Sequence, residues 1–224
     1  VINDAIRRLR ENGFIVNLNH PAWSNQMPDE VLELRGLTAM ELLNSGCSWT
    51  YNAAENQLHY ETCLKAGRRM LALYTDDNHA SCHSFSPRYA GAYAAGAQTC
   101  PPDAAVKIPA LDCCRGYTMI YAQKLEYAAV MEALTEGRYY CSSGPEILAY
   151  YIEDDRICLD CSPVVSVFLK SMAWALSASA MDLEGQITHV EFDLNRLKSN
   201  DEGFFRIELI DRNGRTACTN PHYL

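Results

Sequence analysis

The sequence predicts an α/β protein in two parts, a helix-flanked parallel sheet followed by an antiparallel β module. Through residue 79, segments with helical and strand-like spacing of apolar residues alternate, which is typical of βα units. After Pro145, short β-type runs separated by turn residues replace this alternation, which is most simply a small β-sandwich. We therefore expect a first part at 1–145 and an all-β module at 146–224.

The first elements follow from apolar spacing and from the residues that stop each segment. Gly13, Gly36 and Gly67 each follow a run with helical spacing, where a C-terminal glycine is favoured. The spacing predicts helices at 3–11, from residue 28, and at 55–66, and strands at 14–18, 37–43 and 70–75. A helix thus opens the chain with no strand before it.

Residues 80–114 interrupt this pattern, because they are rich in Ala, Gly, Pro, Ser and Cys and have weak periodicity. We interpret them as an insertion, since loops of this length are usually functional or irregular. Regular patterns then return, with a strand expected at 116–122, a helix at 125–135 and a short strand at 138–141.

The last part alternates in the manner of half-buried strands. Asp154-Asp155 and Asn213-Gly214 are hairpin signals between such strands. Strands are expected at 147–152, 156–161, 164–169, 189–194, 204–210 and 216–218.

Two strand ends carry residues that suit a metal ion. The apolar run at 70–74 ends in Asp77 and His79, and the run at 14–18 ends in His20. Parallel strands place their carboxyl ends at one edge of the sheet, and carboxylate with imidazole suits divalent zinc, manganese or iron. We therefore predict that His20, Asp77 and His79 bind metal, whereas no residue is assigned as the catalytic acid or base.

Four other residues are candidates for supporting roles. Asp76 is expected to orient a ligand, and Asn19 either holds the His20 turn or touches substrate. Ser142 and Ser143 either present hydroxyl groups to a phosphate or belong to a linker turn before Gly144-Pro145.

Composition excludes several classes of partner. The net charge of −9 argues against long nucleic acids but not against a small phosphorylated substrate. No apolar run approaches the ~20 residues of a membrane helix, and residues 1–12 do not resemble a signal peptide. The ten cysteines show no loop framework, so we expect mostly reduced thiols and a cytoplasmic location. The oligomeric state is left open.

Together, Asn19-His20-Pro21, the strand at 36–41, the Thr75 to His79 run and the segment at 137–145 resemble the PHP family of metal-dependent phosphoesterases. The order and spacing of these motifs carry the resemblance across nearly the whole chain, and bacterial PHP proteins with a β-rich C-terminal module are the most similar. The resemblance implies a distorted (β/α)₇ barrel, with His20, Asp77 and His79 at the positions of family ligands. It also implies hydrolysis of a nucleotide, sugar phosphate or histidinol phosphate.

The family's N-terminal His-x-His motif has no counterpart in these 224 residues. We therefore expect the chain to be the C-terminal portion of a longer enzyme and to be inactive by itself. The alternative is a degenerate, non-catalytic PHP-like binding module. A third, weaker possibility is a cysteine-based zinc site, for which Cys158 and Cys161 lack a second pair.

Overall fold

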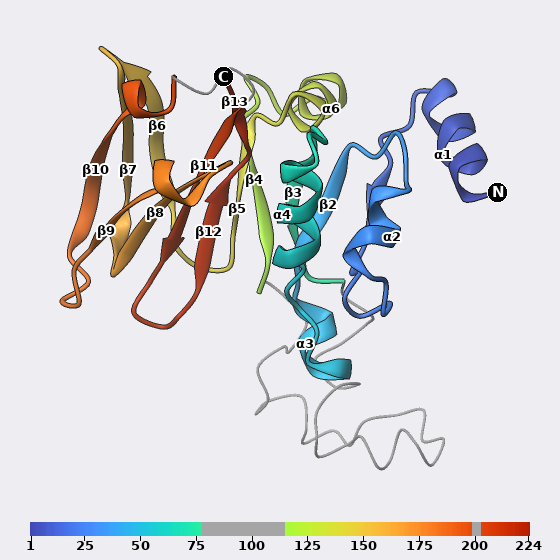
Figure 1. The fold of residues 1–224 in the computed structure, drawn as a ribbon, viewed down its shortest axis with the longest axis horizontal. Helices are drawn as coiled ribbons and strands as arrows, with labels where there is room; N and C mark the ends of the chain where they lie inside the picture. The colour runs from blue at the N-terminus through green and yellow to red at the C-terminus, as the bar shows by residue number, and fades with distance from the viewer. Residues whose placement is uncertain (78–114, 199–202) are drawn as a thin grey trace. The chain divides into compact units, whose positions relative to one another are not determined.

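The structure is a computed structural model that describes residues 1–77, 115–198 and 203–224 (Figure 1). Contacts divide it into two compact units, the first taking in 1–68 and 73–117 and the second 69–72 and 118–224. The protein is mixed α/β, as predicted, and in the described ranges no sheet closes into a barrel. Residues 118–145 were predicted to belong to the first part of the chain, but contacts assign them to the second unit. The expected insertion at 80–114 lies outside the described residues.

The first unit is built around a three-stranded sheet in the order β1-β2-β3. β1 is parallel to β2, with Asn17 opposite Ala39, as the alternation of helices and strands predicts. β2 is buried almost throughout, so it forms the centre of this unit. The strands are β1 (Asn17–Leu18), β2 (Ala39–Asn44) and β3 (Leu71–Thr75), and the helices are α1 (Ile2–Glu11), α2 (Pro28–Leu32), α3 (Ser45–Tyr51) and α4 (Gln57–Lys65).

Helix α3 is the element of this unit that sequence patterns do not predict. Asn44, Ser45 and Gly46 read as a turn, because all three residue types favour turns over helix interiors. In the structure, the Asn44 side chain instead accepts a hydrogen bond of 3.0 Å from the Cys47 backbone N–H and so caps a new helix. The turn signal was therefore the start of α3.

The second unit contains two sheets and helix α6 (Tyr127–Glu136). One sheet has the order β10-β7-β6, and the other runs β4-β5-β12-β11-β8-β9 with β13 paired to β11. All the pairings recorded for β6 to β13 are antiparallel, as predicted for this part of the chain. The strands are β4 (Tyr117–Ile120), β5 (Tyr139–Ser142), β6 (Ile147–Glu153), β7 (Arg156–Val164), β8 (Ser166–Ser171), β9 (Ala178–Met181), β10 (Ile187–Asp193), β11 (Phe204–Ile210), β12 (Thr216–Thr219) and β13 (His222–Tyr223).

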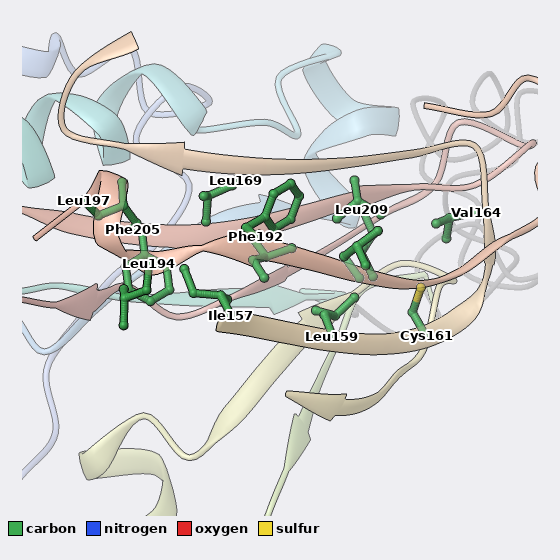
Figure 2. Packing of buried hydrophobic residues seen from close by; sticks show 14 residues of the cluster. Ile157, Leu159, Cys161, Val164, Leu169, Phe192, Leu194, Leu197, Phe205 and Leu209 are labelled. Atoms are coloured by element: carbon green, nitrogen blue, oxygen red, sulfur yellow. The ribbon is translucent and has the colours of Figure 1, made fainter. Parts of the chain in front are cut away.

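Both sheets of the second unit contribute to one apolar cluster (Figure 2). Alternate residues of β7, such as Ile157 and Leu159, lie in the same cluster as alternate residues of β11, such as Phe205 and Leu209. This period of two is the one that a strand needs to bury a single face. The cluster therefore explains why the amphipathic runs after residue 146 fold as strands.

The turn between β6 and β7 confirms one hairpin prediction. Asp154 and Asp155 both have left-handed backbones, with φ of 46° and 60°. Two central residues with positive φ define the turn type whose twist matches antiparallel strands.

In the described part of the chain, no helix has the length and apolar character that crossing a membrane requires.

Replacing a core leucine of the second unit should destabilise the protein. Leu209 is fully buried in the apolar cluster, so Leu209→Ala should lower the free energy of unfolding by about 2–5 kcal/mol in urea denaturation. The matched control is Leu183→Ala, because Leu183 is 83% exposed and its truncation should change stability by less than ~0.5 kcal/mol. Equal effects of the two substitutions would contradict the assigned core.

Candidate functional site at the carboxyl ends of three strands

Polar residues that follow β1, β2 and β3 are joined at one end of the first unit's sheet. Asn44 is the last residue of β2, and its side-chain amide donates to Asp77 Oδ2 at 3.1 Å. Asp77 follows β3 by two residues, and His20 follows β1 by two residues. The described residues of the predicted metal site thus belong to one hydrogen-bonded network.

The centre of this network is the carboxylate of Glu41, a β2 side chain that is only 4% exposed. Its Oε2 accepts hydrogen bonds from the His20 backbone N–H at 2.8 Å and from the Asn44 amide at 2.9 Å. Its Oε1 accepts the Thr75 hydroxyl at 2.8 Å. One buried side chain therefore ties the ends of all three strands together.

His20 has an unusual backbone conformation for a residue with a side chain. Its φ is 33°, in the left-handed region that costs an L-residue roughly 1–2 kcal/mol. Its ring contacts Trp23 edge to face, with 5.0 Å between ring centroids, and its Nδ1 lies 3.1 Å from Ser24 Oγ. Because Nδ1 faces Ser24, Nε2 is the nitrogen that a metal ion would use.

Asp76 and Asp77 have different surroundings although they are adjacent. Asp76 Oδ1 accepts from the Ser45 hydroxyl and from the backbone N–H groups of Arg115 and Gly116, at 2.8–2.9 Å. These bonds hold the end of β3 against the start of α3 and against residues 115–116, and none of them is to a predicted metal ligand. Asp77 is partly exposed and has a left-handed φ of 48°.

Gly46 permits the close approach of α3 to the end of β3. Its N–H donates to the Asp76 carbonyl at 3.0 Å, and a Cβ at this position would lie 3.0 Å from that oxygen. A side chain at Gly46 would therefore push the Asp76–Asp77 backbone away.

The site is electrostatically negative, as the neighbouring cysteine shows. Burial raises the pKa of the Cys47 thiol to about 12, and the carboxylates of Asp77 and Glu41 add to this rise. Charges that disfavour a thiolate favour a cation by the same Coulomb interaction.

The donor set at this end of the sheet fits a divalent cation only in part. His20 and Asp77 supply an imidazole and a carboxylate, whereas both oxygens of Glu41 already accept hydrogen bonds. Within 1–77, 115–198 and 203–224, no three His, Cys, Asp or Glu residues form a group that would hold a metal ion. The third predicted ligand, His79, lies outside the described residues, and Asn19 is an exposed residue after β1.

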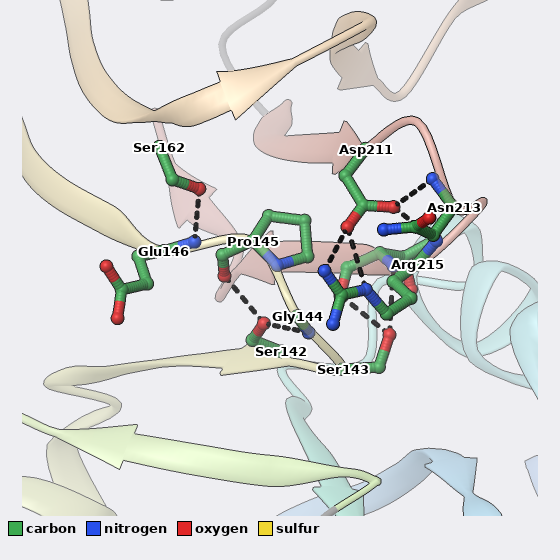
Figure 3. Close-up of polar contacts among 10 residues, drawn as sticks. Ser142, Ser143, Gly144, Pro145, Glu146, Ser162, Asp211, Asn213 and Arg215 are labelled. Carbon is green, nitrogen blue, oxygen red and sulfur yellow. Dashed lines mark hydrogen bonds and ion pairs between the residues drawn. The ribbon is translucent and has the colours of Figure 1, made fainter. Parts of the chain in front are cut away.

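The two candidate serines lie in the second unit, where their hydroxyl groups hold a turn (Figure 3). Ser142 Oγ donates to the Pro145 carbonyl at 2.6 Å and accepts from the Gly144 N–H at 2.8 Å. Ser143 Oγ exchanges hydrogen bonds with the backbone of Thr216, at 2.9 and 3.1 Å. The Ser142 contacts belong to the turn before β6, and the Ser143 contacts join the end of β5 to β12.

Glu41 and Asn44 are the residues of the site that sequence patterns do not identify. One signal was present: Glu41 is a carboxylate inside an otherwise apolar strand run, and a buried acid needs hydrogen-bond partners. Those partners come from residues 20, 44 and 75, which only the folded chain brings together.

Comparison of the chain with models of protein families, with curated proteins and with solved structures finds no match.

Removing the Glu41 carboxylate should destabilise the first unit. Glu41→Ala leaves the N–H of His20, the Asn44 amide and the Thr75 hydroxyl without their buried acceptor, and one such loss costs about 1–3 kcal/mol. Glu41→Gln should be milder, because its amide oxygen can replace Oε2 while its NH₂ donates to the Thr75 hydroxyl. Urea denaturation should rank the proteins wild type, Glu41→Gln, Glu41→Ala, and equal stability of the two variants would contradict this network.

The raised pKa of Cys47 predicts slow alkylation in the folded protein. With a pKa of about 12 against an ordinary value of ~8.5, the thiol is almost entirely neutral at pH 8, and only the thiolate reacts. This preference for the neutral thiol favours the folded state below about pH 8.5, and the contribution is lost as the pH rises towards 12.

Iodoacetamide labelling of Cys47 can be followed by mass spectrometry from pH 7 to 11. The folded protein should react little at pH values where the urea-unfolded control already reacts fully. Half-maximal labelling of the folded chain near pH 8.5 would contradict the assigned surroundings of Cys47.

Proposed function

We propose that the chain is part of a PHP-type phosphoesterase that hydrolyses a small phosphate ester with the help of divalent metal ions. His20, Asp77 and His79 are the proposed ligands, residues 1–145 are the proposed portion of a distorted (β/α)₇ barrel, and residues 146–224 are the proposed β-sandwich domain. The observation that carries the proposal is the hydrogen-bonded series His20–Glu41–Asn44–Asp77 at one end of the sheet.

Backbone strain at the two described ligands supports this proposal. Of the six described residues with side chains and positive φ, five are Asn or Asp, which tolerate this conformation, and Asp77 is one of them. The sixth is His20, so both described members of the predicted ligand set have left-handed backbones. Strained conformations that the surrounding structure maintains occur preferentially at functional sites.

The proposed reaction adds water across a phosphorus–oxygen bond. The water oxygen bonds to phosphorus, the ester oxygen leaves, and one proton of the water completes the released alcohol. A bound divalent cation would lower the pKa of the attacking water and offset the negative charge that develops on phosphate. Glu41 would position His20 and the Asn44–Asp77 pair through its hydrogen bonds, without binding the ion itself.

The substrate class follows from charge. At a net charge of −9, the chain would rely on bound cations to attract a phosphate group, which suits a small substrate such as a nucleotide, sugar phosphate or histidinol phosphate. A cytoplasmic location is part of the proposal, and it is supported by the six described cysteines, whose side chains are buried thiols.

One observation favours the alternative, a non-catalytic binding module. The part of the chain that the structure describes brings together only two of the three proposed ligands, and it contains no larger group of metal-binding side chains. The same assay separates the two proposals, because a binding module would have neither metal-dependent turnover nor sensitivity to loss of His79.

The test is hydrolysis of a generic phosphate ester with added manganese, zinc or iron, for the 224-residue chain and for a version extended upstream with the encoded residues. Since three ligands hold at most one weakly bound ion, the 224-residue chain should show little turnover. The extended version should be active and should lose activity on His79→Ala and His20→Ala, whereas the exposed control His189→Ala should keep it. An extended version without metal-dependent turnover would refute the phosphoesterase proposal.

A further inference from the structure

The left-handed His20 lies in a compact loop between β1 and α2. Three backbone hydrogen bonds close this loop on itself, from Ser24, Asn25 and Gln26 to the carbonyls of His20, Ala22 and Pro21, at 3.0–3.1 Å. Such internal bonds shape the loop, but they do not fix its position on the rest of the first unit.

Asn56, at the start of α4, attaches the loop to its neighbours. Its Oδ1 accepts the Ala22 backbone N–H at 2.8 Å, and its own backbone N–H donates to the Leu42 carbonyl of β2 at 3.0 Å. Its carbonyl accepts the Tyr60 N–H and so begins α4. Asn56 is completely buried, so water does not compete for these bonds.

His59, one turn further along α4, provides a second attachment. Its Nε2 lies 2.7 Å from the carbonyl of Gln26, and because a carbonyl only accepts, the ring must donate from this nitrogen. His59 is 7% exposed, so this bond is also shielded from water. α4 thus holds the loop at residues 22 and 26, on the C-terminal side of His20.

We propose that Asn56, assisted by His59, is a positioning residue for the metal ligand His20. Glu41 accepts the backbone N–H of His20 and Asn56 accepts that of Ala22, so two buried acceptors fix the 19–20 and 21–22 peptide groups, which flank the His20–Pro21 bond. Without the second acceptor, His20 can relax from its left-handed backbone, and its ring then leaves the contact with Trp23. The inference rests on the proposed function only where it calls His20 a metal ligand.

The variants separate positioning from folding. In Asn56→Ser, the shorter side chain no longer reaches the Ala22 N–H. Serine still favours a helix N-terminus, so α4 should form. Asn56→Asp keeps an oxygen acceptor at the same position and should restore the behaviour of the wild type. Asn12→Ala is the matched control, because Asn12 is exposed and its side chain bonds only the Arg8 carbonyl at the end of α1.

Two nuclear magnetic resonance measurements test the proposal on the 224-residue chain. In the metal-free protein, the nuclear Overhauser effect between the His20 and Trp23 rings should be lost in Asn56→Ser and kept in Asn56→Asp and Asn12→Ala. In a manganese titration, which detects weak binding through line broadening, the His20 ring should respond at a roughly 10–100-fold higher concentration in Asn56→Ser.

An unchanged ring contact and manganese response in folded Asn56→Ser would overturn the positioning role. If manganese leaves the wild-type His20 signals unchanged, the metal proposal fails for this chain, and the ring contact still decides whether Asn56 positions His20. A variant with lost ring contact but native dispersion elsewhere supports positioning rather than general unfolding.

Discussion

The buried carboxylate of Glu41 is the constraint on which the candidate site depends. A charged oxygen pair that is 4% exposed is costly unless several hydrogen bonds replace its water. Here the replacements come from the end of β1, from β2 itself and from β3. The Glu41 carboxylate therefore obtains its hydrogen bonds only when three strand ends lie together. This requirement places His20 and the Asn44–Asp77 pair at one edge of the sheet.

The second unit is organised by a different interaction. Its two sheets share an apolar cluster formed by alternate strand residues. The side chains of Ser142 and Asp211 close turns, and Ser143 bonds the backbone of Thr216 across the paired strands β5 and β12. The ion pair of Asp211 with Arg215 belongs to the β11–β12 turn in the same way. The Ser142 and Asp211 contacts are local in sequence, whereas the contacts of Glu41 join the ends of β1, β2 and β3.

Sequence patterns predict the elements that depend on local spacing and miss those that depend on tertiary partners. Strands β6, β7, β8, β10, β11 and β12 and the Asp154–Asp155 turn follow from period-two alternation and from local turn preferences, whereas β9 and β13 were not predicted. Helix α3 and the role of Glu41 do not, because Asn44 and Glu41 each act on residues brought close only by folding. His20 and Asp77 were accessible to prediction because parallel strands share an edge, a rule that needs no knowledge of contacts.

The most direct test of the account is a crystal structure of the chain soaked with manganese, recorded at a wavelength where manganese scatters anomalously. An anomalous peak bonded to both His20 Nε2 and the Asp77 carboxylate is expected, with Glu41 still hydrogen-bonded to the His20 backbone. A peak at another site of the chain would contradict the proposed metal site. So would a His79 side chain that points away from His20 and Asp77 in that crystal structure.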